Sequence, residues 1–267
     1  MAIGLSNIAR GSESGPAALA AEIARRASLA REPQPEDVSV PRTRLFLNEI
    51  GSIVSAPFRR VAPFEVAPAA RPRPVMLLPG FATHPYRMRF MARQLEKAGH
   101  TVKRWGLGFN WGPTCENFAA LEGRLLDLAC RHGEPVVLVG WSLGGIYARE
   151  LAKNYPESVA KVITMGTPFS GSPRGNNAWR LYHLVCGHRV EEPPIEATPA
   201  EKPPVPTVAM WSPRDGIVHA RCACGKPNER DRAIAVRCAH VGFSDSEEVI
   251  RAILAELDMA DSAEAAA

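Results

Sequence analysis

The strongest constraint on the fold is an alternation of short apolar runs and amphipathic segments that begins at Val75. The apolar runs are "PVMLLPG", "HTVKRWGL", "PVVLVGW", "AKVITMGTP", "VPTVAMWS" and the weaker "RAIAVRCAH". Between them, helical spacing of apolar residues occurs near residues 86–98, 115–131, 143–155 and 246–257. Strands that alternate with helices in this way predict a mostly parallel sheet joined by crossover helices. The expected fold class is therefore α/β.

One segment interrupts this alternation. Residues 170–204, which we call the cap segment, follow the fourth apolar run and contain a short helical pattern near 179–185 and a proline-rich return. No further strand pattern occurs in the cap segment, so we expect it to be an insertion that lies over the sheet.

The first 70 residues differ in composition from the rest of the chain. A helical pattern near 17–29 is followed by a stronger amphipathic pattern in "RTRLFLNEIGSIVSAPF" and by the linker "APAARPRP". We expect residues 1–70 to form an arm with helices, of which the first 40 residues are loosely attached. Residues 71–267 are expected to form the main domain.

Composition narrows the class of partner and the compartment. With 267 residues, 46% of them apolar, the chain can bury a full core. Lys and Arg number 32 against 28 Asp and Glu, without a basic stripe, so no nucleic-acid partner is expected. No secretory signal pattern and no apolar stretch of membrane-spanning length is found, which favours a soluble, cytoplasmic protein. The six cysteines are then expected to be mostly free thiols.

The stretch "VVLVGWSLGG" places Ser142 between a buried strand pattern and a helical pattern. Gly140-Trp141-Ser142-Leu143-Gly144 matches G-x-S-x-G, in which a strained turn presents the serine hydroxyl and the glycines remove side chains that would collide. The alternative is an ordinary strand-to-helix turn with a serine that caps the helix. The context on both sides favours a nucleophile.

A serine nucleophile needs a base to accept its proton and an acid to orient that base. Behind such a turn the acid and then the base follow along the chain. Asp215 follows the run "VPTVAMWS", and His240 follows the last weak run, so both are expected at the sheet edge where Ser142 emerges. The rivals are His219 for the base and Asp231 or Asp245 for the acid.

An acyl-transfer intermediate also requires N–H donors for its oxyanion. We expect one from the backbone of Leu143 and a second from Phe81, in the loop "LLPGFATHPY" after the first apolar run. Substrate contacts are expected from Trp111 and from Trp179 and Tyr182 of the cap segment. The alternative is that these cap residues only bury their helix on the sheet.

The stretches "LLPGF", "WGLGFNWGP", "LVGWSLGGIYARELA", "VITMGTPFSGSP" and "DGIV" together resemble the α/β-hydrolase superfamily, and more narrowly bacterial lipase-like serine esterases with a GWSLGG elbow. The resemblance covers about residues 74–257. It implies a hydrolase of acyl esters with Ser142, Asp215 and His240 as catalytic triad, and Phe81 and Leu143 as oxyanion donors. The chain departs from larger members in lacking recognisable strands before Val75.

Other chemistries are weighed against this one. Cys222, Cys224, Cys238 and His240 could offer metal ligands, but C-x-C and C-x-H spacings chelate zinc poorly, so no metal and no cofactor is expected. A disulfide from Cys238 to Cys222 or Cys224 is a second alternative. A thioesterase or acyltransferase would use the same triad, and a non-catalytic binding protein would need only the fold. The expected partner is a small acyl ester or a lipid.

Overall fold

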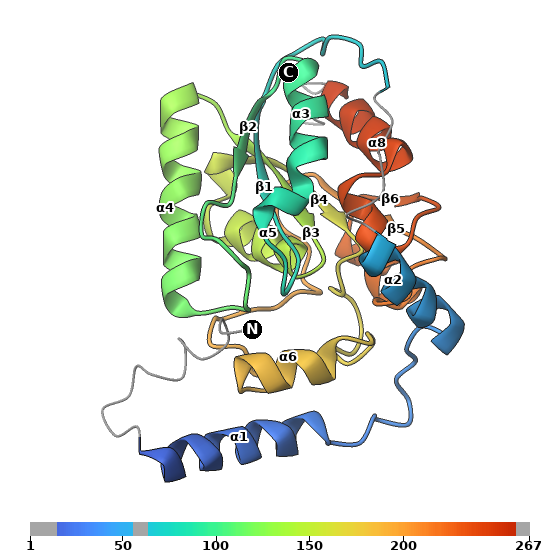
Figure 1. The fold of residues 1–267 in the computed structure, drawn as a ribbon. Helices are drawn as coiled ribbons and strands as arrows, with labels where there is room; N and C mark the ends of the chain where they lie inside the picture. Colours follow the sequence, from blue (N-terminus) through green and yellow to red (C-terminus); the bar gives the residue numbers. More distant parts are fainter. Residues whose placement is uncertain (1–14, 56–63, 260–267) are drawn as a thin grey trace.

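A computed structural model describes residues 15–55 and 64–259 (Figure 1). Its centre is a six-stranded sheet in the order β2-β1-β3-β4-β5-β6, in which every neighbouring pair is parallel. The strands are β1 Pro74–Leu78, β2 Thr101–Arg104, β3 Val136–Trp141, β4 Val159–Met165, β5 Thr207–Trp211 and β6 Arg232–Ala235. The six apolar runs thus form the six strands, and the predicted α/β class is confirmed.

Helices cover both faces of the sheet, because successive side chains of a strand point to opposite faces. On one face, Val137 and Val139 share a core with α3 (Arg89–Lys97) and α8 (Glu247–Asp258). On the other, Val136 and Leu138 pack with α4 (Cys115–His132) and α5 (Leu143–Asn154). The central strand β3 is buried along its whole length. Ser142 therefore follows a fully buried strand at the centre of the sheet.

Short 3₁₀ helices and one short α-helix complete the main domain. They are η1 Pro85–Met88, η2 Pro156–Ser158, η3 Pro227–Glu229, η4 His240–Ser244 and α7 Ala220–Cys224. None of these was expected as a separate element from the sequence, because so few residues are too short a stretch to show a helical period.

Two helices lie across the carboxyl ends of the strands in Figure 1. The cap segment contains α6 (Trp179–Cys186), and α1 (Pro16–Ala30) packs against its outer side. A third helix, α2 (Thr43–Ser55), lies beside η4. The predicted helices of the arm and of the cap segment are therefore present.

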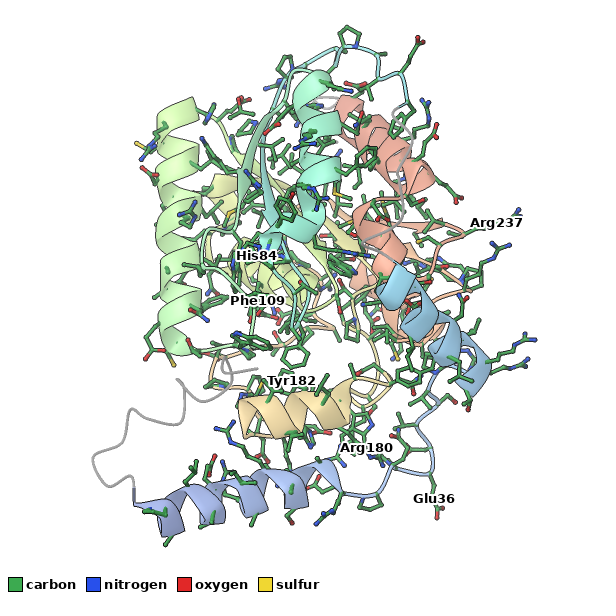
Figure 2. The ribbon with its side chains drawn as sticks, viewed as in Figure 1. Glu36, His84, Phe109, Arg180, Tyr182 and Arg237 are labelled. Atoms are coloured by element: carbon green, nitrogen blue, oxygen red, sulfur yellow. The ribbon has the colours of Figure 1, made fainter. Side chains whose placement is uncertain are left out.

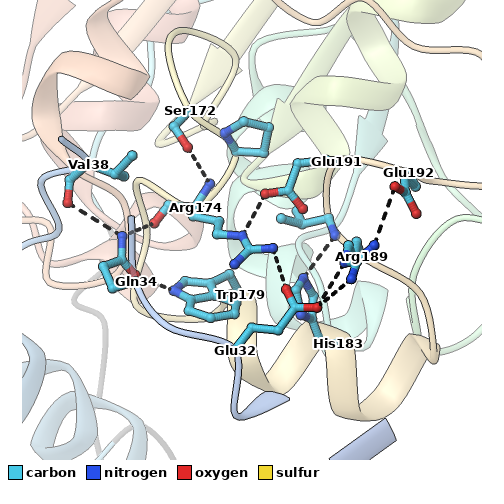
Figure 3. A network of polar contacts seen from close by, with 12 residues as sticks. Glu32, Gln34, Val38, Ser172, Arg174, Trp179, His183, Arg189, Glu191 and Glu192 are labelled. Atoms are coloured by element: carbon cyan, nitrogen blue, oxygen red, sulfur yellow. Dashed lines mark hydrogen bonds and ion pairs between the residues drawn. The ribbon is translucent and has the colours of Figure 1, made fainter. Parts of the chain in front are cut away.

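The arm is attached to the cap segment by polar contacts, which are drawn in Figure 3. Glu32 lies 2.5 Å from Arg174 and 2.8 Å from Arg189. The Trp179 Nε1–H donates to Gln34 at 2.8 Å. The expectation of a loose attachment is therefore wrong for residues 15–40, because composition does not reveal pairing with a distant segment.

Among the described residues, no helix has the length and apolarity needed to span a membrane. All six cysteines are free thiols. Neither disulfide alternative for Cys238 is formed in this structure.

Candidate active site

The turn from β3 to α5 holds Ser142 in a backbone conformation that side chains rarely adopt. Its φ is 53° and its ψ is −121°. A Cβ on Gly140 would lie 2.4 Å from the Gly144 carbonyl oxygen, and one on Gly144 would lie 2.2 Å from the oxygen of Leu78. Only glycine fits at both positions. Strain of this kind costs roughly 1–3 kcal/mol and persists where the surrounding packing enforces it.

Two further loops at the same sheet edge bring Asp215 and His240 together. Asp215 lies in the loop after β5, and His240 begins η4 after β6. His240 Nδ1 lies 2.8 Å from Asp215 Oδ2, and both side chains are buried. The other oxygen, Asp215 Oδ1, accepts hydrogen bonds from the amides of Ile217 and Val218 at 2.8 Å each. One oxygen of the Asp215 carboxylate is therefore held by the amides of its own loop, and the other oxygen orients the imidazole of His240.

This hydrogen bond decides which ring nitrogen carries the proton. A carboxylate accepts but does not donate, so the neutral ring of His240 carries its proton on Nδ1 and leaves Nε2 as a proton acceptor. Burial by itself lowers the pKa of His240, but the Asp215 carboxylate and, less strongly, Glu49 outweigh it and raise the pKa above its usual value. The pair has the chemistry of a general base with its orienting acid.

The rival residues have other roles. His219 caps α7 by accepting a hydrogen bond from the Arg221 amide. Asp231 accepts from the Thr207 amide at 2.8 Å and pairs with Lys202 at 3.0 Å. The backbone of Asp245 ends η4. Of the three candidate acids, the one hydrogen-bonded to His240 is Asp215.

His240 and Ser142 line the same cavity, which has a volume of about 1030 Å³ and opens to solvent. Within the described part of the chain, no hydrogen bond joins the Ser142 hydroxyl to the imidazole. Such bonds are often long in a site without substrate and shorten when substrate binds. The sequence-predicted nucleophile and base therefore face the same cavity.

The predicted oxyanion donors lie on the loop after β1 and at the first residue of α5. Outside the regular helices and strands of the described residues, neither the Phe81 nor the Leu143 amide donates to a backbone carbonyl. Buried Asn110 shapes the first loop: its side chain donates to the Pro79 carbonyl at 2.8 Å, and its own carbonyl accepts from Ala82 at 2.7 Å. Asn110 was not identified from the sequence, although its stretch "WGLGFNWGP" was.

A second, more enclosed cavity of about 110 Å³ is also lined by Ser142. Its lining is mainly apolar and includes Phe81, Leu143, Ile146, Trp179 and Tyr182. In Figure 2, Tyr182 lies on the side of α6 that faces the sheet and Arg180 on the side that faces α1. Trp179 and Tyr182 thus reach the site.

Trp111 is placed differently from the other predicted substrate contacts. It lines neither cavity beside Ser142. It stacks on Phe109 at a centroid distance of 5.2 Å, and Phe109 lines the open cavity. Trp111 therefore contacts the open cavity only indirectly, through the ring of Phe109.

Gly166, directly after β4, also belongs to the site. Its φ is +54°, and a Cβ there would lie 3.0 Å from Asp215 Oδ2 and 3.1 Å from His240 Nδ1. The stretch "ITMGTP" signals a turn after a strand, but a turn pattern does not say what the glycine faces. Only the packed structure reveals that this glycine makes room for the acid–base pair.

Comparisons with known proteins show the family of the chain. The family model described as "Alpha/beta hydrolase family" matches residues 75–239, more than half of the chain. No curated protein matches the chain by sequence.

Several solved structures share the fold. The mature lipase BlEst2 of Bacillus licheniformis has a TM-score of 0.56 and 18% identity, covering 74% of this chain and 97% of that one. A structure from a study of LipS and LipT, two metagenome-derived lipolytic enzymes, has a TM-score of 0.51 and 19% identity. The match covers 72% of this chain and 99% of that one. The monoacylglycerol lipase of Paleococcus ferrophilus has a TM-score of 0.50 and 17% identity. The match covers 72% of this chain and 96% of that one. Such identities show a common fold, and together with the family model they place this chain in the α/β-hydrolase family.

Proposed function

We propose that this protein is a serine hydrolase that cleaves carboxylic acyl esters through an acyl-enzyme on Ser142. The observation that carries the proposal is the buried His240–Asp215 pair, hydrogen-bonded at 2.8 Å, because its His240 lines the same cavity as Ser142 of the strained turn. The lipases among the structures of similar fold support an ester as the substrate class.

In the proposed mechanism, the Ser142 hydroxyl oxygen attacks the ester carbonyl while His240 Nε2 accepts its proton. The Asp215 carboxylate stabilises the imidazolium. The amides of Phe81 and Leu143 donate to the oxyanion. Collapse of the intermediate breaks the bond to the alcohol, which takes its proton from His240. A water molecule, deprotonated by the same imidazole, then attacks the acyl-enzyme. The bond between the acyl carbon and the Ser142 oxygen breaks, His240 returns the proton to that oxygen, and the carboxylic acid leaves.

The two cavities suggest how an ester is placed. The more enclosed cavity suits the acyl chain, because its lining is mainly apolar and includes Ile146, Trp179 and Tyr182. The open cavity beside His240 suits the alcohol, which must receive a proton from that residue and leave. A space of about 110 Å³ favours short or medium acyl chains over long ones.

Labelling with a fluorophosphonate tests the nucleophile. The wild type should react at the serine and hydrolyse p-nitrophenyl esters, with an optimum at short or medium chain length. Ser142→Ala should abolish labelling and lower kcat by about 10⁴-fold or more, because removal of a triad member leaves only binding and the oxyanion donors. Ser158→Ala is a matched control in η2, which precedes β4 at the opposite edge of the sheet, and should change neither.

The same assay separates the alternatives. Faster turnover of acyl thioesters than of matched oxyesters would indicate a thioesterase. Transfer to an added alcohol in preference to water would indicate an acyltransferase. A folded wild type that neither labels nor hydrolyses any ester would overturn the proposal in favour of a binding protein.

A further inference from the structure

Glu49 on α2 is a fully buried carboxylate on a helix that is otherwise largely exposed. Its relative exposure is 0%, whereas Leu47 and Ile50 on the same helix are 61% and 45% exposed. Burying a carboxylate is costly unless hydrogen bonds replace its water. The side chain must therefore have specific partners.

Those partners are three backbone amides on the two loops that carry the acid and the base. Glu49 Oε1 accepts from the amide of Gly216 at 3.0 Å and from the amide of His240. Glu49 Oε2 accepts from the amide of Val241 at 3.2 Å. Gly216 directly follows Asp215 in the chain. The Glu49 carboxylate therefore binds the residue next to the proposed acid, Asp215, and also the backbone of the proposed base, His240.

The fit between α2 and the acid loop is close. A Cβ on Gly216 would lie 2.3 Å from the Leu45 carbonyl oxygen and 2.7 Å from Glu49 Cγ. The amides of His240 and Val241 are the first two of η4 and have no partner within that helix. Without Glu49, three buried N–H groups beside the acid and the base would lose their acceptor.

We propose that Glu49 is a positioning residue: its carboxylate fixes the Asp215 loop and the His240 loop relative to each other, so the N-terminal arm completes the active site. This inference rests on the proposed function for its catalytic meaning. Glu49 lies in the N-terminal arm, outside residues 75–239, which the family model matches.

The carboxylate also acts on His240 by its charge. The charged groups that face the imidazole are Asp215 from the β5 loop and Glu49 from α2, and the buried Cys238 thiol lies among the same carboxylates with Asp245 and Glu248. Both carboxylates favour the protonated ring and so raise the pKa of His240. Removing one negative charge should therefore lower the pKa of His240 and shift the acidic limb of kcat/KM to lower pH.

Two substitutions separate geometry from charge. Glu49→Gln keeps the length of the side chain and loses the charge and the bond to Val241. Glu49→Asp keeps the charge but is one methylene too short to contact both loops. Asn48→Ala, at an exposed neighbouring position on α2, is the control. Each variant is measured for kcat, KM, the pH profile with p-nitrophenyl butyrate, fluorophosphonate labelling and thermal unfolding.

Glu49→Gln should lower kcat about ten-fold with KM within two-fold and shift the acidic limb to lower pH. Glu49→Asp should lower kcat by about 10²-fold with the limb nearly unmoved, since small displacements of reacting groups cost rates of this size. Asn48→Ala should match the wild type. The proposal would be overturned if the Glu49 variants had lower thermal stability but the kcat of the wild type and an unshifted acidic limb of the pH profile. Failure of both Glu49 variants to fold would also overturn it.

A spectroscopic readout keeps this test independent of the proposed function. The low-field proton resonance of His240 Nδ1–H reports the bond to Asp215, and it should shift or broaden in both Glu49 variants but not in Asn48→Ala. If the wild type neither labels nor hydrolyses esters, the proposed function fails and the resonance alone decides about Glu49. An unchanged resonance in Glu49→Gln and Glu49→Asp overturns the positioning role.

Discussion

At the scale of single residues, the site depends on positions where no side chain has room. Gly140 and Gly144 let the strand and helix meet around Ser142, and Gly166 leaves space beside the acid–base pair. Trp141 contacts the backbone of the base: its Nε1–H donates a hydrogen bond to the His240 carbonyl at 3.1 Å. The geometry of His240 is therefore set by contacts to its backbone as well as to its ring.

Gly166→Ala should impair catalysis more than folding. The added methyl would press on Asp215 and His240 and occupy a positive φ, so we expect kcat/KM to fall by about 10²-fold. The free energy of unfolding should fall by roughly 1–3 kcal/mol. Steady-state kinetics with denaturant unfolding gives both numbers.

Gly123→Ala is the matched control, because that glycine lies on the exposed side of α4 and a Cβ added to it would have no atom within 4 Å apart from those of its chain neighbours and its own helix backbone. It should increase stability by roughly 0.5–1 kcal/mol and leave activity unchanged. Equal activity of the two variants would contradict a role for Gly166 in spacing the pair.

At the scale of elements, α6 has two faces with different tasks. Tyr182 and Trp179 are buried and line the enclosed cavity, whereas Leu184 is 43% exposed. The ring of Tyr182 lies 5.3 Å from that of Phe81, whose amide is a proposed oxyanion donor. The cap helix therefore borders the proposed acyl site and contacts the loop after β1.

Tyr182→Ala should shift substrate preference toward longer acyl chains. Each additional methylene that the enlarged cavity buries contributes up to about 0.8 kcal/mol, or about four-fold in kcat/KM. A series of p-nitrophenyl esters of increasing length measures the shift. Leu184→Ala, on the outer face of the same helix, should leave the preference unchanged, and an unshifted optimum in Tyr182→Ala would place the acyl chain elsewhere.

At the scale of the whole molecule, α1 of the arm and α6 of the cap segment form a second layer over the carboxyl ends of the strands (Figure 1), and the contacts drawn in Figure 3 join the arm to the cap segment. Glu32 links Arg174 and Arg189, and Arg174 also pairs with Glu191 at 2.7 Å. The hydrogen bond from Arg189, followed by that from Arg174, lowers the pKa of Glu32 below its usual 4.5. The attachment of the arm therefore depends on an ionised carboxylate.

Glu32→Gln should loosen this layer in a pH-dependent way. Because the pKa is lowered in the folded protein, the stabilisation is fully present above pH 4.5 and is lost as the pH falls through the lowered value. We expect the variant to be less stable by about 1 kcal/mol at neutral pH, a difference that shrinks under acid conditions. Denaturant unfolding between neutral and acid pH measures this.

Glu36→Gln is the control, since Glu36 is exposed and points away from the protein in Figure 2. It should match the wild type at every pH. A difference for Glu32→Gln that stays constant with pH would mean that the ion pairs do not hold the arm.

Much of this protein follows from local patterns in its sequence. The six strands and the four longer helices α3, α4, α5 and α8 of the main domain were predicted within a few residues, because apolar periodicity records which face of each element is buried. The positions of Ser142, Asp215 and His240 follow from the same reasoning, because parallel strands end at one edge and their loops meet there. The wall residues Trp179 and Tyr182 were expected from a short apolar helix in the cap segment.

Tertiary structure alone decided the rest. Glu49 and His240 are separated by 191 positions in the chain, and Glu32 and Arg174 by 142, so no local pattern relates either pair. Gly166 and Asn110 carry only the signals of turn residues until other segments pack against them. Periodicity specifies which residues are buried, whereas a hydrogen bond between distant segments depends on how the elements pack, and that packing exists only in the folded chain.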